Sequence, residues 1–111
     1  IGPEVIAIFR QGGHAMKMFL VVYAEASDES ITEAFKQAGY RSYTKIRGAT
    51  GEGVESEPKL DSHIWPGRNN TLMLAVPDSD VGRLIDLVRR LRDEHPRAGL
   101  RAFTFPLEEC V

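Results

Sequence analysis

The order of the predicted elements limits the fold of this chain most, because strand, helix and strand follow one another twice. Residues 17–24 (KMFLVVYA) are apolar nearly throughout and rich in Val, Phe and Tyr, which is typical of a buried central strand. A helix follows, in which Ser30 and Glu33 have the spacing of a capping box and Gly39 ends the pattern. Its apolar stripe consists of Ile31, Ala34, Phe35 and Ala38. Residues 40–47 alternate as a strand exposed to water on one face does.

The second half of the chain shows the same order. Residues 71–76 (TLMLAV) indicate another buried strand, and Asp78-Ser79-Asp80 offers caps for a second helix. The apolar face of that helix consists of Val81, Leu84, Ile85, Leu87, Val88 and Leu91. His95-Pro96 ends the helix, and residues 100–105 form the last predicted strand, which Pro106 prevents from continuing inside a sheet.

This order predicts an α+β fold, the ferredoxin-like βαββαβ sandwich, with one antiparallel sheet and two helices on one of its faces. In this fold, no helix covers the other face of the sheet. The strands at 17–24 and 71–76 are nevertheless more apolar than is usual for strands with one face exposed to water. An exposed apolar sheet face is usually an interface. We therefore expect the protein to form oligomers through it, most simply a homotrimer with clefts between neighbouring copies.

A long connection, Arg47–Asn70, joins the second and third predicted strands. It contains four glycines and two prolines, which argues against a hidden helix. Connections longer than about 15 residues without structure of their own are uncommon and tend to be functional. Near its end, His63 and Trp65 stand beside the turn-forming Pro66. The indole more simply fills a cleft between subunits than stacks on a base.

Composition restricts the class of partner. The chain has 111 residues, a formal net charge of −2 and a pI near 5.9, so it has no broad attraction to nucleic acid or anionic lipid. Its single cysteine, Cys110, excludes an intrachain disulfide and fits a reducing compartment. No apolar run approaches the roughly 20 residues of a membrane span. We expect a cytoplasmic protein that binds no nucleic acid and does not insert into membranes.

The first residues stand apart from this pattern. Residues 1–15 carry one short apolar run and end in a Gly12-Gly13 break. They form either a native N-terminal extension with one added strand or a segment that derives from expression or from translation upstream of an internal start. We therefore assign the folded domain to residues 16–111.

Two stretches of the chain resemble the PII nitrogen-regulatory proteins and their PII-like relatives. They are KMFLVVYAEASDESITEAFKQAGYRSYTKIRG and the closing LRAFTFPLEECV, in which Phe-x-x-Pro-hydrophobic-Glu-Glu ends the last strand. The resemblance covers about residues 17–111, places the long connection at the PII T-loop position, and through Ser-His-Ile-Trp-Pro-Gly points to a divergent branch. It implies a trimeric signalling protein that binds adenine nucleotides or other small ligands between subunits and contacts a target, such as a transporter or an enzyme, through the T-loop.

The resemblance also assigns ligand-binding residues. Arg47, Gly48, Gly51 and Gly53 match the glycine-rich start of the T-loop, where glycines let backbone N–H groups converge on phosphate. Arg101 stands where the family has a phosphate-binding lysine, and an arginine binds phosphate bidentately. The expected ligand is therefore a small anion, with ATP, ADP and AMP as candidates. The connection contains no tyrosine, so the family's uridylylation is not available.

The alternative function is a copper- or divalent-metal-binding trimer of the CutA type. It would use His63 together with Cys110, because sulfur and imidazole ligands favour copper or zinc. A lone loop imidazole is more often hydrogen-bonded or solvated than bound to a metal. No nucleophile and base stand at a spacing typical of catalysis, so we do not expect an enzyme.

Overall fold

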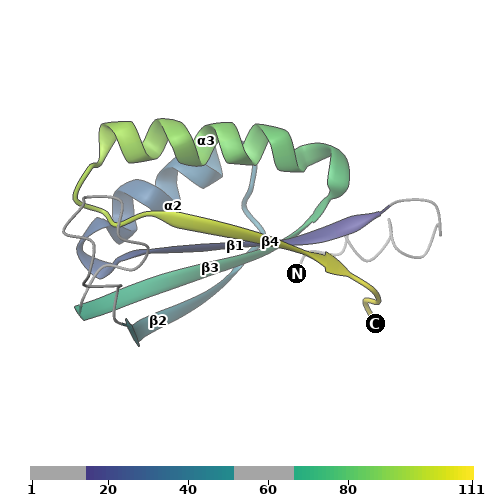
Figure 1. Cartoon of the computed structure of the whole chain (residues 1–111), viewed down its shortest axis with the longest axis horizontal. Coiled ribbons are helices and arrows are strands. Elements are labelled where there is room, and N and C mark those ends of the chain that lie inside the picture. The colour runs from purple at the N-terminus through teal and green to yellow at the C-terminus, as the bar shows by residue number, and fades with distance from the viewer. Residues whose placement is uncertain (1–14, 52–66) are drawn as a thin grey trace, which may run out of the picture.

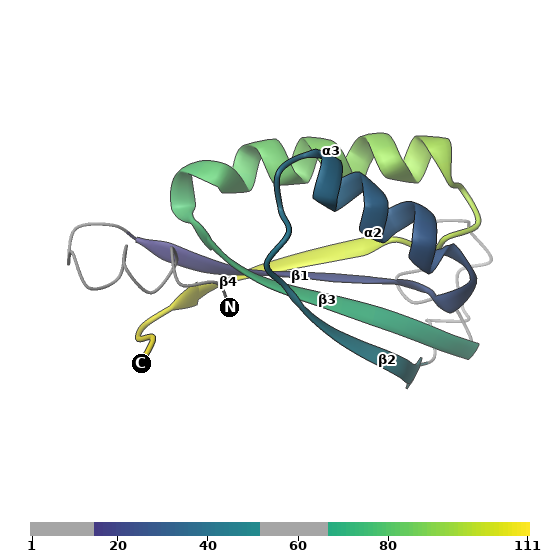
Figure 2. The ribbon, with the colours of Figure 1, turned by 180° about the vertical axis from the view of Figure 1, so that it is seen from behind.

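The computed structural model describes residues 15–51 and 67–111, and it confirms the α+β, ferredoxin-like prediction. Two helices lie on the same face of a four-stranded antiparallel sheet whose strand order is β2-β3-β1-β4 (Figures 1 and 2). The elements are β1 (Met16–Ala24), α2 (Asp28–Gln37), β2 (Thr44–Gly51), β3 (Gly67–Pro77), α3 (Val81–Glu94) and β4 (Arg101–Leu107), with short 3-10 helices at Glu25–Ser27 and Asp78–Asp80. Among the described residues, no helix is long and apolar enough to cross a membrane. The N-terminal extension predicted at residues 1–15 lies outside the described residues except for Ala15.

The main core lies between the sheet and the two helices. Because side chains alternate along a strand, every second residue of the two central strands points toward the helices. The buried side chains on this face are Phe19, Val21 and Tyr23 of β1 and Leu72, Leu74 and Val76 of β3. The helices contribute Ile31 and Phe35 of α2 and Leu84, Leu87, Val88 and Leu91 of α3. The helical periodicities predicted these residues correctly.

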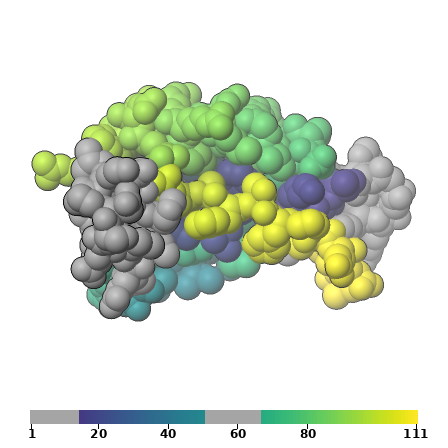
Figure 3. Space-filling view, viewed as in Figure 1, coloured from purple at the N-terminus to yellow at the C-terminus, as the bar shows by residue number. Residues whose placement is uncertain are grey.

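The opposite face of the sheet, which we call the open face, is also apolar. Leu20 lies at its centre, opposite Met73 on β3 and opposite Phe103 on β4. Ile46, Phe103 and Phe105 all lie on this face and remain 48%, 46% and 45% exposed. The prediction of an apolar sheet face that the helices do not cover is therefore confirmed for the described residues. The space-filling view shows β4 as an edge strand at the surface of the molecule (Figure 3).

Asp80 occupies the cap position of α3 as predicted, but the predicted capping bonds are not made at either helix. A 3-10 turn leads directly into α2, so the helix already begins at Asp28 and Ser30 lies within its first turn. Ser27 occupies the cap position but makes no side-chain capping bond, and neither does Asp80 at the start of α3. The carboxylate of Asp28 instead accepts a hydrogen bond from the Tyr23 hydroxyl. Asp28, which could have capped the helix, thus makes a tertiary hydrogen bond instead.

The second and third strands extend into the segment that was predicted to be a free connection. The strand predicted at residues 40–47 is displaced, because β2 begins at Thr44 and ends at Gly51. Its last residues pair with the start of β3, where Thr50 lies opposite Arg68 and Gly51 opposite Gly67. The part of the Arg47–Asn70 connection that is not in these strands, residues 52–66, lies outside the described residues. A shift in register between Ile46 and Ala49 allows the pairing to continue past Arg47 and Gly48.

The last strand also continues further than predicted. β4 includes Pro106, which pairs with Lys17, and Leu107, which pairs with Met16. Because β4 is an edge strand, the missing N–H of Pro106 can face away from the ladder without loss of a bond.

We expect a Gly48→Ala substitution to lower the free energy of unfolding by about 1–2 kcal/mol, because Gly48 has φ +70 and an L-residue is strained there. Among the described residues, a Cβ atom at Gly48 would meet the Arg68 guanidinium alone, at 3.8 Å, so the cost comes from the backbone conformation and not from a clash. Urea denaturation measures the change. Gly82→Ala is the matched control: it lies in α3 with open space around it and should stabilise the protein by about 0.5 kcal/mol. Equal effects of the two substitutions would contradict the assignment of strain to Gly48.

Candidate functional site

The residues predicted to bind a small anion, as far as the structure describes them, lie at one end of the sheet. This is the end where β2 finishes at Gly51, β3 starts at Gly67 and β4 starts at Arg101, with Arg101 opposite Val22 of β1. Figure 1 shows the three strand ends on the side opposite to the C-terminus. The other predicted residues of the connection, Gly53, His63 and Trp65, lie outside the described residues.

Within one chain, however, these residues form two separate groups. Arg47, Gly48 and Gly51 are on β2, whereas Arg101 is on β4, and these two strands are the opposite edges of the sheet. Three strand spacings of about 4.8 Å separate the edges, so the two groups are about 14 Å apart. A single copy of the chain does not bring them together.

A polar cluster lies between β2 and the start of α2, next to Arg47. Its centre is the carboxylate of Asp28, the first residue of α2. The Tyr23 hydroxyl donates a hydrogen bond to Asp28 Oδ1 at 2.6 Å, and Lys45 Nζ donates to Asp28 Oδ2 at 2.9 Å and to Thr32 Oγ1 at 3.0 Å. Arg47 Nη1 lies 3.7 Å from the same carboxylate, while the Arg47 side chain remains 68% exposed. A contact of this length at an exposed side chain is weak, so Arg47 lies near Asp28 and is open to a ligand.

These contacts also fix the charge of the cluster. Burial favours the neutral form of Asp28, but hydrogen bonds from Tyr23, Lys45 and Asn70 outweigh it and hold the pKa of the carboxyl well below its usual range. Burial, together with the hydrogen bond to Asp28, raises the pKa of the Tyr23 hydroxyl above its usual range. At neutral pH, Asp28 is thus an anion and Tyr23 keeps its proton.

Asn70 connects the cluster to the part of β2 where the register with β3 shifts. Its side chain is fully buried, and its Oδ1 accepts a hydrogen bond from the backbone N–H of Gly48 at 3.2 Å. The N–H of Gly48 is therefore occupied by Asn70. In this structure, the positive φ of Gly48 also allows the backbone bend at this point of β2.

Sequence reasoning did not identify Tyr23, Asp28, Lys45 or Asn70 as members of a site. One signal was present: Lys45 lies opposite Leu72, a core residue, and so occupies a strand position that faces the helices. A lysine at such a position needs a buried acidic partner. The sequence pattern does not show which of the many carboxylates supplies it.

Arg101, on β4, is the predicted ligand-binding residue at the other edge of the sheet. It is the first residue of β4, is half-buried, and shares the open face with Phe103 two residues later. Its guanidinium thus lies next to the apolar surface that would contact a second copy of the chain.

The structure gives no support to the metal alternative among the residues that it describes. Cys110 follows β4, whose end pairs with Met16 at the start of β1. It therefore lies beyond the end of the sheet opposite to Gly51 and Gly67. Within residues 15–51 and 67–111, no three His, Cys, Asp or Glu side chains come together as metal ligands would.

Comparison with known proteins identifies the fold. No protein family and no curated protein matches the sequence. Among solved structures, the chain is similar to CPII, a nitrogen regulatory PII-like protein from Thiomonas intermedia bound to ADP, AMP and bicarbonate (TM-score 0.61, 17% identity, 88% of this chain and 98% of that chain). It is also similar to a PII-like signalling protein from Thermus thermophilus (TM-score 0.58, 24% identity, 85% and 88%). A functionally unknown protein from Pediococcus pentosaceus has a TM-score of 0.64 at 12% identity, with 89% and 98% covered. The chain thus has the fold of the PII-like proteins, as the sequence resemblance predicted.

Proposed function

We propose that this protein is a PII-like regulator that assembles as a homotrimer through the open face and binds a small anionic ligand in the clefts between copies. Adenine nucleotides are the first candidates for the ligand, since the similar CPII is described with bound ADP, AMP and bicarbonate. In this proposal the protein acts by binding and not by catalysis.

The observation that carries the proposal is the separation of the two ligand groups. Arg47 lies on one edge of the sheet and Arg101 on the other, and the apolar open face joins them. A neighbouring copy packed on that face would place its own β4 edge beside the β2 edge of the first. Each cleft would then hold the exposed guanidinium of Arg47 from β2 and the half-buried guanidinium of Arg101 from β4, which suits a phosphate-bearing ligand.

The position of this cleft explains how a ligand would be sensed. Arg47 and Gly51 lie at the base of the 52–66 connection, which we propose as the T-loop that contacts a partner. A ligand that binds one arrangement of this base more tightly would shift the population toward it. The partner would be a transporter or an enzyme whose activity depends on that arrangement.

The test is isothermal titration calorimetry with ATP, ADP and AMP, followed by copper and zinc ions. We expect Arg101→Ala to weaken nucleotide binding about tenfold or more, because a hydrogen bond to a charged group contributes about 1.5–3 kcal/mol. Arg92→Ala is the control, since Arg92 is an exposed arginine in the last turn of α3 and should leave the affinity unchanged.

Nucleotide affinity that is the same in Arg101→Ala and in the unmodified protein would overturn the proposed site. Metal binding that disappears in His63→Ala would favour the CutA-type alternative in its place.

A further inference from the structure

The outer surface of the helix layer contains an open groove that the proposed function does not use. It lies between α2 and α3 and has a volume of about 510 Å³. Both helices lie on the sheet face opposite to the open face (Figure 1). Its floor is apolar, formed by Leu87 with Ala34 and Ala38. The sequence pattern assigned Ala38 to the buried stripe of α2, but Ala38 is exposed and lines this groove.

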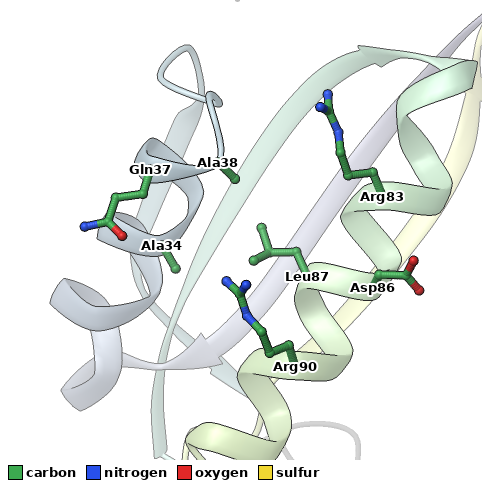
Figure 4. Close-up of a pocket in the computed structure, with 7 residues that line it drawn as sticks. All are labelled: Ala34, Gln37, Ala38, Arg83, Asp86, Leu87 and Arg90. Atoms are coloured by element: carbon green, nitrogen blue, oxygen red, sulfur yellow. The ribbon is translucent and has the colours of Figure 1, made fainter.

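Two arginines of α3 form one wall of the groove. Figure 4 shows Arg83, Leu87 and Arg90 extending from α3 toward α2. Gln37 and Asp86 also line the groove, and the Asp86 carboxylate lies 3.8 Å from the Arg89 guanidinium. The arginine side chains are 66% and 62% exposed. They are seven residues apart, two helical turns, so their positions on the helix are separated by about 10 Å.

Arg83 is held in place before any partner arrives. Its Nη2 donates a hydrogen bond to the Tyr40 hydroxyl at 2.6 Å and lies 3.4 Å from Asp80, and the Tyr40 hydroxyl donates to Asp80 at 3.0 Å. A side chain that is already ordered loses less entropy when it binds. Arg90 has an exposed contact with Glu94, at 3.8 Å, and such contacts are weak enough to be exchanged.

We propose that this groove binds an acidic segment of a partner protein, with two carboxylates about 10 Å apart and one apolar side chain between them. The carboxylates would pair with Arg83 and Arg90, and the apolar side chain would lie on Leu87. In an extended segment, alternate side chains share a face, so residues four apart point to the same side, about 13 Å apart, with the middle residue between them; the flexible glutamate and arginine side chains can close the difference from the arginine spacing. Because both helices lie on the sheet face opposite to the open face, the groove between them stays free when copies of the chain assemble.

The probe is a fluorescein-labelled peptide with two glutamates four residues apart and a leucine midway between them, titrated with the 111-residue protein to about 1 mM, the range of weak binding. We expect saturable binding by fluorescence anisotropy. Arg83→Glu with Arg90→Glu should weaken it about tenfold or more. The matched control, Arg89→Glu with Arg92→Glu, changes the net charge equally on other sides of the same helix and should change binding less than about twofold.

Since Arg83 also contacts Tyr40 and Asp80, a further variant leaves both arginines intact. Ala38→Trp introduces a large side chain at an exposed groove position and should block the peptide. Replacing the glutamates by glutamine, or the leucine by serine, should weaken binding as well. The proposal is overturned if binding does not saturate, if both arginine pairs weaken it equally, or if Ala38→Trp has no effect. None of these results depends on nucleotide binding, so they test the groove separately from the cleft.

Discussion

A Phe103→Glu substitution is expected to convert the proposed trimer into monomers. Phe103 is 46% exposed on the open face of the edge strand β4, opposite Leu20 and two residues from Phe105. Burying a phenylalanine side chain contributes about 1.5–3 kcal/mol, and a carboxylate in the same place would have to lose its hydration without a partner. In a trimer the penalty occurs once in each copy. Association should therefore be lost while the main core, which lies on the other face of the sheet, stays intact.

Size-exclusion chromatography with light scattering measures this directly. One chain has a mass of 12.4 kDa, and three would give about 37 kDa. Thr104→Glu is the matched control, because it places the same charge one residue further along β4, on the face opposite to Phe103, and should leave the mass unchanged. An unmodified protein that elutes as a monomer at micromolar concentration would overturn the proposed assembly, and with it the cleft.

The fold could be predicted because its signals are local. Strand and helix periodicities repeat every two or about 3.6 residues, so each is visible within one element. The apolar stripe of α3 identified its buried residues, and the excess apolar character of β1 and β3 correctly indicated a second apolar face. The element order then left the split βαβ arrangement as the predicted topology.

The strand ends could not be predicted in the same way. The pairing of Ala49 with Asn69 depends on a shift in register that the positive φ of Gly48 permits. A glycine in a polar segment looks the same in sequence whether it lies in a free connection or in a bulged strand. The predicted connection was therefore too long at both ends.

The polar cluster escaped prediction because its members are distant in sequence. Lys45 is 17 residues from Asp28, and Asn70 is 22 residues from Gly48. Only the folded sheet brings them together, and a pattern within a single element does not contain this information. The same reason applies to Arg47 and Arg101: the resemblance assigned both to one ligand, but only the strand order shows that they occupy opposite edges.

Asp28→Ala should give the largest loss of stability of any substitution proposed here, about 3 kcal/mol in the free energy of unfolding. The Asp28 side chain is 20% exposed, and its removal leaves the buried Tyr23 hydroxyl without an acceptor and Lys45, 14% exposed, without its ion pair. Asp86→Ala is the control, since Asp86 is 79% exposed and its contact with Arg89 lies at the surface; it should change stability by less than about 0.5 kcal/mol. Urea denaturation of both variants measures the difference. Adding Lys45→Met to Asp28→Ala should recover part of the loss, because the unpaired charge is then absent.

The pH dependence of stability tests whether this loss comes from the ionised carboxylate. The pKa of Asp28 is lower in the folded protein than in the unfolded chain, so the unfolded chain takes up the proton first as the pH falls. The stabilisation is therefore fully present above about pH 5 and declines as the pH falls below about 4, the usual range of an aspartate. Unfolding of the unmodified protein should become easier in this range by more than unfolding of Asp28→Ala does. Parallel curves for the two proteins would mean that Asp28 contributes through packing alone. Its ion pair with Lys45 would then add no stability.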